Sequence, residues 1–241
     1  MRIRNNLVAL FVQRLYSMQN NCMGRTARRI SSGTRINSAA DDAAGLAISE
    51  SVRARIRSLM AASRNSGDAA SMAQTAEGAM ASMQVALQRM RELAVQSASD
   101  TNEDTDREAL DAEYQHLLKE LQDISEEADF NGKLLLAGRP DHDPSVFLIQ
   151  VGPDTGDTFS LIIGNITPDS LSLSGTHIRT GDAAADALSG LDSAIERVSG
   201  ERANLGAVQM RLDHKMKSMD ALTENLSEAD SRIRDADIAE E

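Results

Sequence analysis

Three stretches of this chain repeat apolar residues in alternating steps of four and three, and two of them lie far apart in the sequence. The first stripe contains Ala76, Met80, Met83, Leu87, Met90 and Ala94. The second contains Leu110, Tyr114, Leu117, Leu121, Ile124 and Ala128. The third contains Leu191, Ile195, Val198, Leu205, Leu212, Met216, Met219 and Leu226. This spacing gives each helix one narrow apolar seam, which is buried only against other helices.

The first and third stripes lie in different halves of the chain, so we predict that the two halves pack side by side. Polar residues interrupt the third stripe at Arg202, Gln209 and Thr223. The chain has no Trp, only 2 Tyr and only 4 Phe, so Ala, Leu, Ile and Met must fill a thin core. The predicted fold is mainly α: an elongated antiparallel helical bundle or coiled-coil rod with one small β-hairpin region.

The hairpin is predicted where the composition changes, in residues 140–181, which hold all 4 prolines. Two runs, VFLIQV and TFSLII, flank the turn-forming sequence GPDTG. In the first run Phe147, Ile149 and Val151 are expected to face one way, with Phe159, Leu161 and Ile163 as their partners. Three helices are expected in the body of the chain. The first spans about residues 42–99 and the last runs from 181 to about 227. The middle helix is expected to begin at a capping box at residues 105–108 and to end at an Asn131-Gly132 cap.

These patterns suggest three parts of the chain. Residues 1–41 form an N-terminal segment, residues 42–235 the helical body with the hairpin region at 140–181, and residues 236–241 the start of a further segment. The N-terminal segment carries the stripe Val8, Phe11, Leu15 and Met18, but weak helix formers interrupt it. We therefore expect it to be helical when its apolar side has a partner and largely disordered through residue 40 in the free chain.

Charge is distributed unevenly. Residues 1–64 hold 11 Arg against 3 acidic residues, whereas the net charge of the whole chain is −12. Such asymmetry can indicate binding to nucleic acid or to a membrane. Here the arginines are spread along the segment and the acidic remainder would repel a polyanion. We expect charge complementarity within the chain or between copies of it, and no nucleic-acid or membrane partner.

The sequence contains no pattern typical of an active site. The 4 histidines lack metal-ligand spacing, and there is no HExxH, no phosphate-binding loop and no G-x-S-x-G turn. A single cysteine, Cys22, excludes an intrachain disulfide. The apolar run at the N-terminus is too short and interrupted for a signal peptide, and no stretch reaches the length of a membrane span. We predict a protein that is not an enzyme and needs no cofactor or metal.

One surface is a candidate for binding another protein. Arg89, Leu93 and Gln96 follow four- and three-residue steps beside the first stripe, and Gln88 adjoins them. Together with Glu113 from the following helix, Arg89 and Leu93 would form a mixed polar and apolar patch, the kind in which binding energy is concentrated. The alternative is that Leu93 only broadens the packed face of its helix.

Long ordered motifs make the chain resemble bacterial flagellins over practically its whole length. They include MRIRNNLVAL, SSGTRINSAADDAAGLAISE, QTAEGAM, QRMRELAVQSAS and DFNGKLLLAG. Near the C-terminus they include LSGLDSAIERVSGERANLGAVQMRLDH and NLSEADSRIRDADIAEE. The resemblance covers the two inner flagellin domains, and the variable outer domains of larger flagellins are not expected. The related hook–filament junction proteins share the terminal pattern and remain the alternative.

The resemblance implies a structural subunit of the extracellular flagellar filament that polymerises with itself beneath the flagellar cap. It implies export through the flagellar type III apparatus without a cleaved signal peptide, and assembly through the segment with Val8, Phe11, Leu15 and Met18. It also implies recognition by the flagellin-sensing Toll-like receptor at positions corresponding to Arg89, Leu93 and Glu113. The sequence stops at Glu241, where flagellins continue into a helix that docks the export chaperone, so chaperone binding is not expected for this chain.

Overall fold

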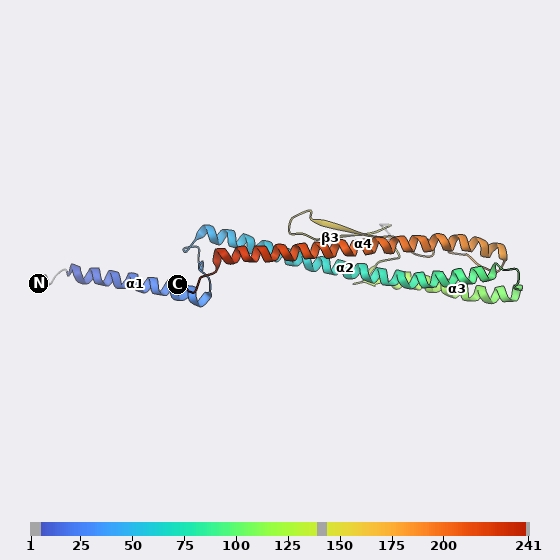
Figure 1. The fold of residues 1–241 in the computed structure, drawn as a ribbon, viewed down its shortest axis with the longest axis horizontal. Coiled ribbons are helices and arrows are strands. Elements are labelled where there is room, and N and C mark those ends of the chain that lie inside the picture. The colour runs from blue at the N-terminus through green and yellow to red at the C-terminus, as the bar shows by residue number, and fades with distance from the viewer. Residues whose placement is uncertain (1–5, 139–143, 240–241) are drawn as a thin grey trace. The chain divides into compact units, whose positions relative to one another are not determined.

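The computed structural model describes residues 6–138 and 144–239, and over these residues it is mainly α-helical (Figure 1). The helices are α1 (Leu7–Ser32), α2 (Ala43–Ser97), α3 (Asp104–Glu127) and α4 (Gly181–Arg234). The strands are β1 (Asp129–Phe130), β2 (Lys133–Leu134), β3 (Ser145–Gln150) and β4 (Thr158–Ile163). The predicted fold class is confirmed, except that the described residues form two small antiparallel hairpins and not one.

The chain divides into two compact units. The smaller unit combines Met1–Met60 with Met219–Glu241, and the larger unit is Ala61–Ser218. Helices α2 and α4 each contribute to both units, so this division does not follow the bounds of the three parts expected from the sequence. The bounds of the three expected parts and of the hairpin region stay a prediction. Two of these bounds, residues 140 and 241, lie outside the described residues.

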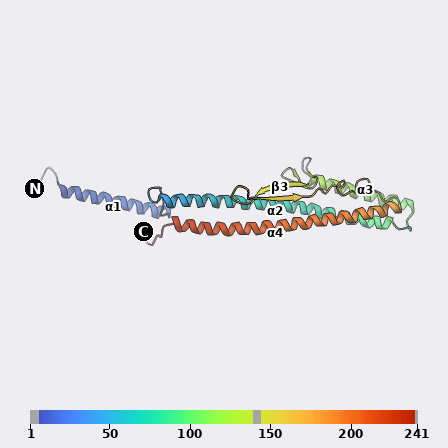
Figure 2. The same ribbon diagram turned by 90° about the horizontal axis from the view of Figure 1, so that it is seen from above.

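In the larger unit α2 and α4 run side by side, as both views show (Figures 1 and 2). Every residue of the first stripe is fully buried, and Leu191, Val198, Leu205 and Leu212 of the third stripe are at most 1% exposed. Polar contacts join Glu77 to Arg202, Gln84 to Ser199 and Arg91 to Asp192. Residue numbers rise along α2 as they fall along α4, so the helices are antiparallel and the predicted pairing of distant seams is confirmed.

Arg202 fills the first polar interruption of the third stripe. Its Nε donates to Glu77 Oε1 at 3.1 Å, a terminal nitrogen donates to the same oxygen at 2.7 Å, and the guanidinium also bonds Gln84. About a third of each charged side chain is exposed, so the ion pair adds little to stability. Its main effect is to fix one register between the two helices, since a shift by one turn would separate the two charges.

The ends of α3 differ from the prediction. The helix begins just after Glu103, whose backbone N–H donates to Asp106 Oδ2 at 3.3 Å, two residues before the box expected at Thr105. It ends at Glu127, and Asn131-Gly132 is not its cap. Asn131 and Gly132 instead form the two-residue turn between β1 and β2, with φ of 53° and 74°. A tight hairpin turn of this kind requires positive φ at both central residues, which Asn and Gly adopt most readily.

The second hairpin has two of the three predicted apolar pairs. Phe147 lies opposite Leu161 and Ile149 opposite Phe159, whereas Ile163 pairs with Ser145. Val151 follows β3, and its N–H donates to the carbonyl of Asp157 at 2.9 Å. The hairpin lies against α2, where Asn65 Nδ2 donates to the carbonyl of Gln150 at 3.1 Å.

In the smaller unit a buried carboxylate joins the first turns of α2 to the end of α4. Asp230 accepts hydrogen bonds from Ser49 Oγ at 2.5 Å and from Arg53 Nε at 2.8 Å. Burial opposes ionisation of Asp230, but the bonds from Arg53 and Ser49 outweigh it and lower the pKa of Asp230. Backbone bonds from Arg35 N to the Arg234 carbonyl and from Ala236 N to the Gly33 carbonyl extend the contact.

Helix α1 is a regular helix that buries none of its residues. Asn6 Oδ1 accepts from Ala9 N at 3.2 Å and caps its start, and Gly33 at φ 68° ends it. The side chains of its stripe are largely exposed: Val8 72%, Phe11 60%, Leu15 48% and Met18 61%. Most of the stability of a helix in a protein comes from packing of its apolar face, and α1 buries none of its residues.

We therefore expect trypsin to cut the free chain first within α1, after Arg14, Arg25 or Arg28. Further trimming after Arg29 or Arg35 should leave a stable fragment that begins at Ile30 or Ile36, as read by mass spectrometry. Arg202, which is held against Glu77 in the larger unit, is the internal control. Equal protection of α1 and of Arg202 in a monomer would contradict this prediction.

Candidate binding surface on α2 and α3

Arg89 joins the exposed faces of α2 and α3. Its Nε donates to Glu113 Oε1 at 2.9 Å, its second terminal nitrogen lies 2.8 Å from that oxygen, and its first lies 3.0 Å from Glu92 Oε2. The side chains of Arg89 and Glu113 are 49% and 46% exposed. The bonds to Glu113 and Glu92 raise the pKa of Arg89. The structure thus brings together the arginine and the glutamate that the sequence analysis placed in one patch.

Leu93 is buried, unlike the other residues predicted for this patch. It is 1% exposed and belongs to the core of the larger unit, so it broadens the packed face of α2, as the alternative interpretation held. Gln88 and Gln96 are exposed. The exposed apolar side chain beside Arg89 is Val85, at 68%. Val85 was not predicted as part of this surface, although its position one helical turn before Arg89 puts both on the same side of α2.

A shallow hollow of about 380 Å³ lies next to Arg89, between α2 and α3. Its lining residues are Ser82, Val85, Ala86, Arg89, Leu117 and Glu120. Apolar side chains therefore border charges of both signs in one exposed hollow. This combination suits a protein partner with an apolar side chain and a complementary polar rim.

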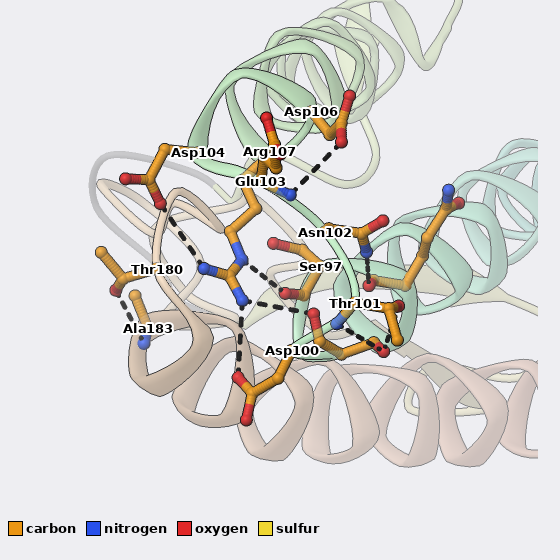
Figure 3. A network of polar contacts seen from close by, with 12 residues as sticks. Ser97, Asp100, Thr101, Asn102, Glu103, Asp104, Asp106, Arg107, Thr180 and Ala183 are labelled. Carbon is orange, nitrogen blue, oxygen red and sulfur yellow. Dashed lines mark hydrogen bonds and ion pairs between the residues drawn. The ribbon is translucent and has the colours of Figure 1, made fainter.

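Arg107 fixes the turn between α2 and α3 that positions this surface (Figure 3). Its Nε donates to the carbonyl of Ser97 at 3.1 Å, and a terminal nitrogen donates to the carbonyl of Ser99 at 3.2 Å. Asp100 and Asp104 each lie 3.6 Å from the guanidinium. The last carbonyls of a helix have no partner within the helix, so Arg107 satisfies acceptors that would otherwise need water.

Asn102 adds a second restraint at this turn, because its Nδ2 donates to the carbonyl of Gln96 at 2.6 Å (Figure 3). The turn therefore holds the end of α2 against the start of α3 and sets which residue of α3 meets Arg89. Sequence spacing gives no sign of these contacts, since an arginine in a first helical turn is more often solvated.

The inner face of α3 is anchored by Asp111, which is 1% exposed. It accepts hydrogen bonds from the backbone N–H of Ile178 at 2.9 Å and from Arg179 Nε at 2.7 Å. Burial of Asp111 opposes its ionisation, but these bonds and one from Gln115 outweigh it and lower the pKa of Asp111. Next to it the hydroxyl of Tyr114 bonds that of Thr176 at 2.8 Å. Glu113 is thus carried by a helix that is fixed on its opposite side.

Within the described ranges 6–138 and 144–239 no group of three or more His, Cys, Asp or Glu side chains is placed to hold a metal ion. None of the helices described there has the length and apolarity needed to cross a membrane. The one thiol, Cys22, is free and exposed on α1.

Comparison with known proteins identifies the family. The model of the bacterial flagellin N-terminal helical region matches residues 3–140, and that of the C-terminal helical region matches residues 188–241. The chain belongs to the bacterial flagellin family. The Arg89–Glu113 surface lies within the first of these two matched regions, and the segment between the two contains the β3–β4 hairpin of this flagellin.

Relatives match this flagellin along its full length. It is 42% identical over 243 residues to flagellin of Halalkalibacterium halodurans, with all of this chain and 88% of that protein covered. It is 39% identical over 271 residues to flagellin of Bacillus subtilis, with 100% and 89% covered. The crystal structure of Bacillus cereus flagellin superimposes with a TM-score of 0.58 at 34% identity, over 65% of this chain and 88% of that one.

Proposed function

We propose that this flagellin is a non-enzymatic structural subunit of the bacterial flagellar filament and works outside the cell. The observation that carries the proposal is the unburied apolar stripe of α1, because a regular helix with Val8, Phe11, Leu15 and Met18 exposed needs a partner surface. In a homopolymer that surface comes from other copies. A role at the hook–filament junction is the alternative, and the family models, which describe flagellins, favour the filament.

Export and assembly of this chain would take the route that the resemblance to flagellins implies. The chain would leave the cell through the flagellar type III apparatus and join the growing end beneath the flagellar cap. An intact N-terminal methionine or Arg2 on secreted protein, determined by N-terminal sequencing, supports this route. Removal of an N-terminal peptide during secretion would count against it.

Self-assembly is tested by placing a charge in the stripe. Phe11→Asp should reduce the sedimentable polymer formed in the flagellated cell at least tenfold, because a buried unpaired carboxylate strongly opposes association. Gln13→Asp puts the same charge on α1 outside the stripe and is the matched control. Equal amounts of polymer for both variants and for the unmodified chain would refute assembly through this face.

A second proposed function is recognition by the flagellin-sensing Toll-like receptor through Arg89, Glu113 and the neighbouring Gln88 and Gln96. Support comes from the Arg89–Glu113 pair, which presents a fixed guanidinium beside exposed Val85. Arginines beside apolar anchors often dominate binding energy. Leu93 would contribute indirectly, because its burial in the core holds the backbone of α2 in place.

Arg89→Ala and Glu113→Ala are each expected to shift the dose response in a receptor reporter assay to several-fold higher protein concentrations. Leu93→Ala should act in the same direction, with circular dichroism used to check that the helices are retained. Arg91→Ala is the matched control, since Arg91 is an exposed arginine of α2 that pairs with Asp192 instead of Glu113. A dose response unchanged by Arg89→Ala would dispose of this second function.

A further inference from the structure

A basic hollow lies in the smaller unit, between the end of α1 and the loop that follows it. It has a volume of about 720 Å³. Its lining includes Arg25, Arg28 and Arg29, together with the polar side chains of Ser31, Ser32, Asn37 and Ser38. Such a set of guanidinium, hydroxyl and amide donors suits a ligand that carries several carboxylates.

Two of the arginines have capacity for a partner. Arg25 and Arg28 are exposed, and among the described residues neither forms an ion pair. Arg28 uses only its Nε, which donates to the carbonyl of Gly24 at 3.2 Å. Three residues apart on a helix, they project on the same side of α1, about 4.5 Å apart along its axis.

The one carboxylate among the lining residues of the hollow, Asp41, already accepts hydrogen bonds from its own loop. Asp41 Oδ2 accepts from Ser38 N and Ser38 Oγ, each at 2.9 Å, and from Asn37 N at 3.3 Å. Arg25 and Arg28 therefore keep positive charge that Asp41 does not neutralise, and acidic groups from outside the unit would stabilise it.

The last two turns of α3 carry acidic residues at the same spacing. Glu120 and Asp123 are three residues apart, Glu127 follows one turn later, and all three are exposed. The nearest basic residue on α3 is Lys119, just before this stretch. Two exposed helix faces with opposite charges at matching three-residue intervals can dock with their charges paired.

We propose that the hollow of Arg25, Arg28 and Arg29 binds the acidic end of α3, at Glu120, Asp123 and Glu127, of a second copy of this chain. The inference rests on the proposed self-assembly and names one of its contacts. A copy of the same chain is favoured over a nucleic acid or an anionic membrane because the exposed acids of α3 match the spacing of Arg25 and Arg28, and because the proposed polymer brings copies of the chain together.

Crosslinking between two copies tests the contact without requiring a filament. Cys22 is exposed on α1, three residues before Arg25. The full chain is mixed with a second copy that carries Cys22→Ser and Lys119→Cys, and a short bismaleimide is added. A crosslink between positions 22 and 119 is expected, with a yield that falls at least fivefold on raising the salt concentration from 50 mM to 500 mM, since exposed pairs are screened.

Reversing the charges on each copy then tests whether the crosslink depends on these particular residues. Arg25→Glu with Arg28→Glu should lower the yield at least fivefold, and so should Glu120→Arg with Asp123→Arg in the partner copy. Combining the two reversed copies should restore at least half of the original yield, whereas Arg14→Glu, elsewhere on α1, should change nothing. The absence of the crosslink, or the absence of restoration, would overturn the proposal.

Two further outcomes distinguish this proposed contact from filament assembly in general and from binding of a polyanion. Polymer that sediments normally while the 22–119 crosslink is missing would refute the contact and leave filament assembly standing; loss of both would refute both. Arginine-dependent binding to duplex DNA or to phosphatidylglycerol vesicles, without the crosslink, would mean that the hollow serves a polyanion and not a second copy.

Discussion

Leu87→Ala is expected to lower the free energy of unfolding of the larger unit by about 3–4 kcal/mol. Leu87 is fully buried in the stripe of α2 and belongs to the same core as Met83, Met90 and Leu191. Removing its isobutyl group loses the transfer free energy and leaves a cavity that stiff neighbouring helices close only in part. The melting temperature should fall by roughly 8–12 °C, as followed by circular dichroism at 222 nm.

Val85→Ala is the matched control, because Val85 lies two residues earlier on the same helix and is 68% exposed. Its effect should stay within about 0.5 kcal/mol. Similar losses for Leu87→Ala and Val85→Ala would mean that the stripe does not form the core.

Asp111→Ala is expected to cost about 2 kcal/mol, mostly because the buried N–H of Ile178 loses its acceptor. Arg179 contributes less, since its side chain is 66% exposed and water can replace the carboxylate. Arg179→Ala should therefore cost clearly less than Asp111→Ala in urea denaturation. The reverse order would contradict the role assigned to the Ile178 bond.

The same carboxylate predicts a pH dependence. Because the pKa of Asp111 is lower in the folded chain than its unfolded value near 3.9, its stabilising contribution is complete above that value. The contribution is lost as the pH falls through the folded pKa. Asp111→Asn should therefore be less stable than the unmodified chain at pH 7, and the difference should shrink steadily below about pH 4. A constant difference down to pH 2 would exclude this carboxylate as the titrating group.

The apolar periodicity predicted the helices and their buried faces because burial of a narrow seam is a local property of the sequence. Ala76, Met80 and Leu87 are buried as their spacing required. The alternating runs likewise predicted that Phe147 pairs with Leu161. The Asn131-Gly132 turn was assigned to the wrong element, since β1 and β2 have only two residues each and show no alternation.

Contacts between distant residues could not be predicted in this way. Arg107 reaches the carbonyls of Ser97 and Ser99 only because the turn after α2 folds back on itself. Asp111 meets Ile178 67 residues later, through packing that no spacing encodes. At the candidate site the same limit left Leu93 undecided, because a residue beside a seam is buried or exposed according to which helix covers it.

Helices α2 and α4 of one chain pack antiparallel in a single register and so hold the Arg89–Glu113 surface in place. The decisive measurement of this register is a crosslink between Gln84→Cys and Ser199→Cys in a Cys22→Ser monomer, since Gln84 Nε2 lies 3.4 Å from Ser199 Oγ. A short bismaleimide should join these positions within one chain in high yield. It should not join Gln84→Cys to Lys217→Cys, which is about 27 Å further along the helix. Equal yields for the two pairs, or no intrachain product for 84 and 199, would contradict this antiparallel register of α2 and α4.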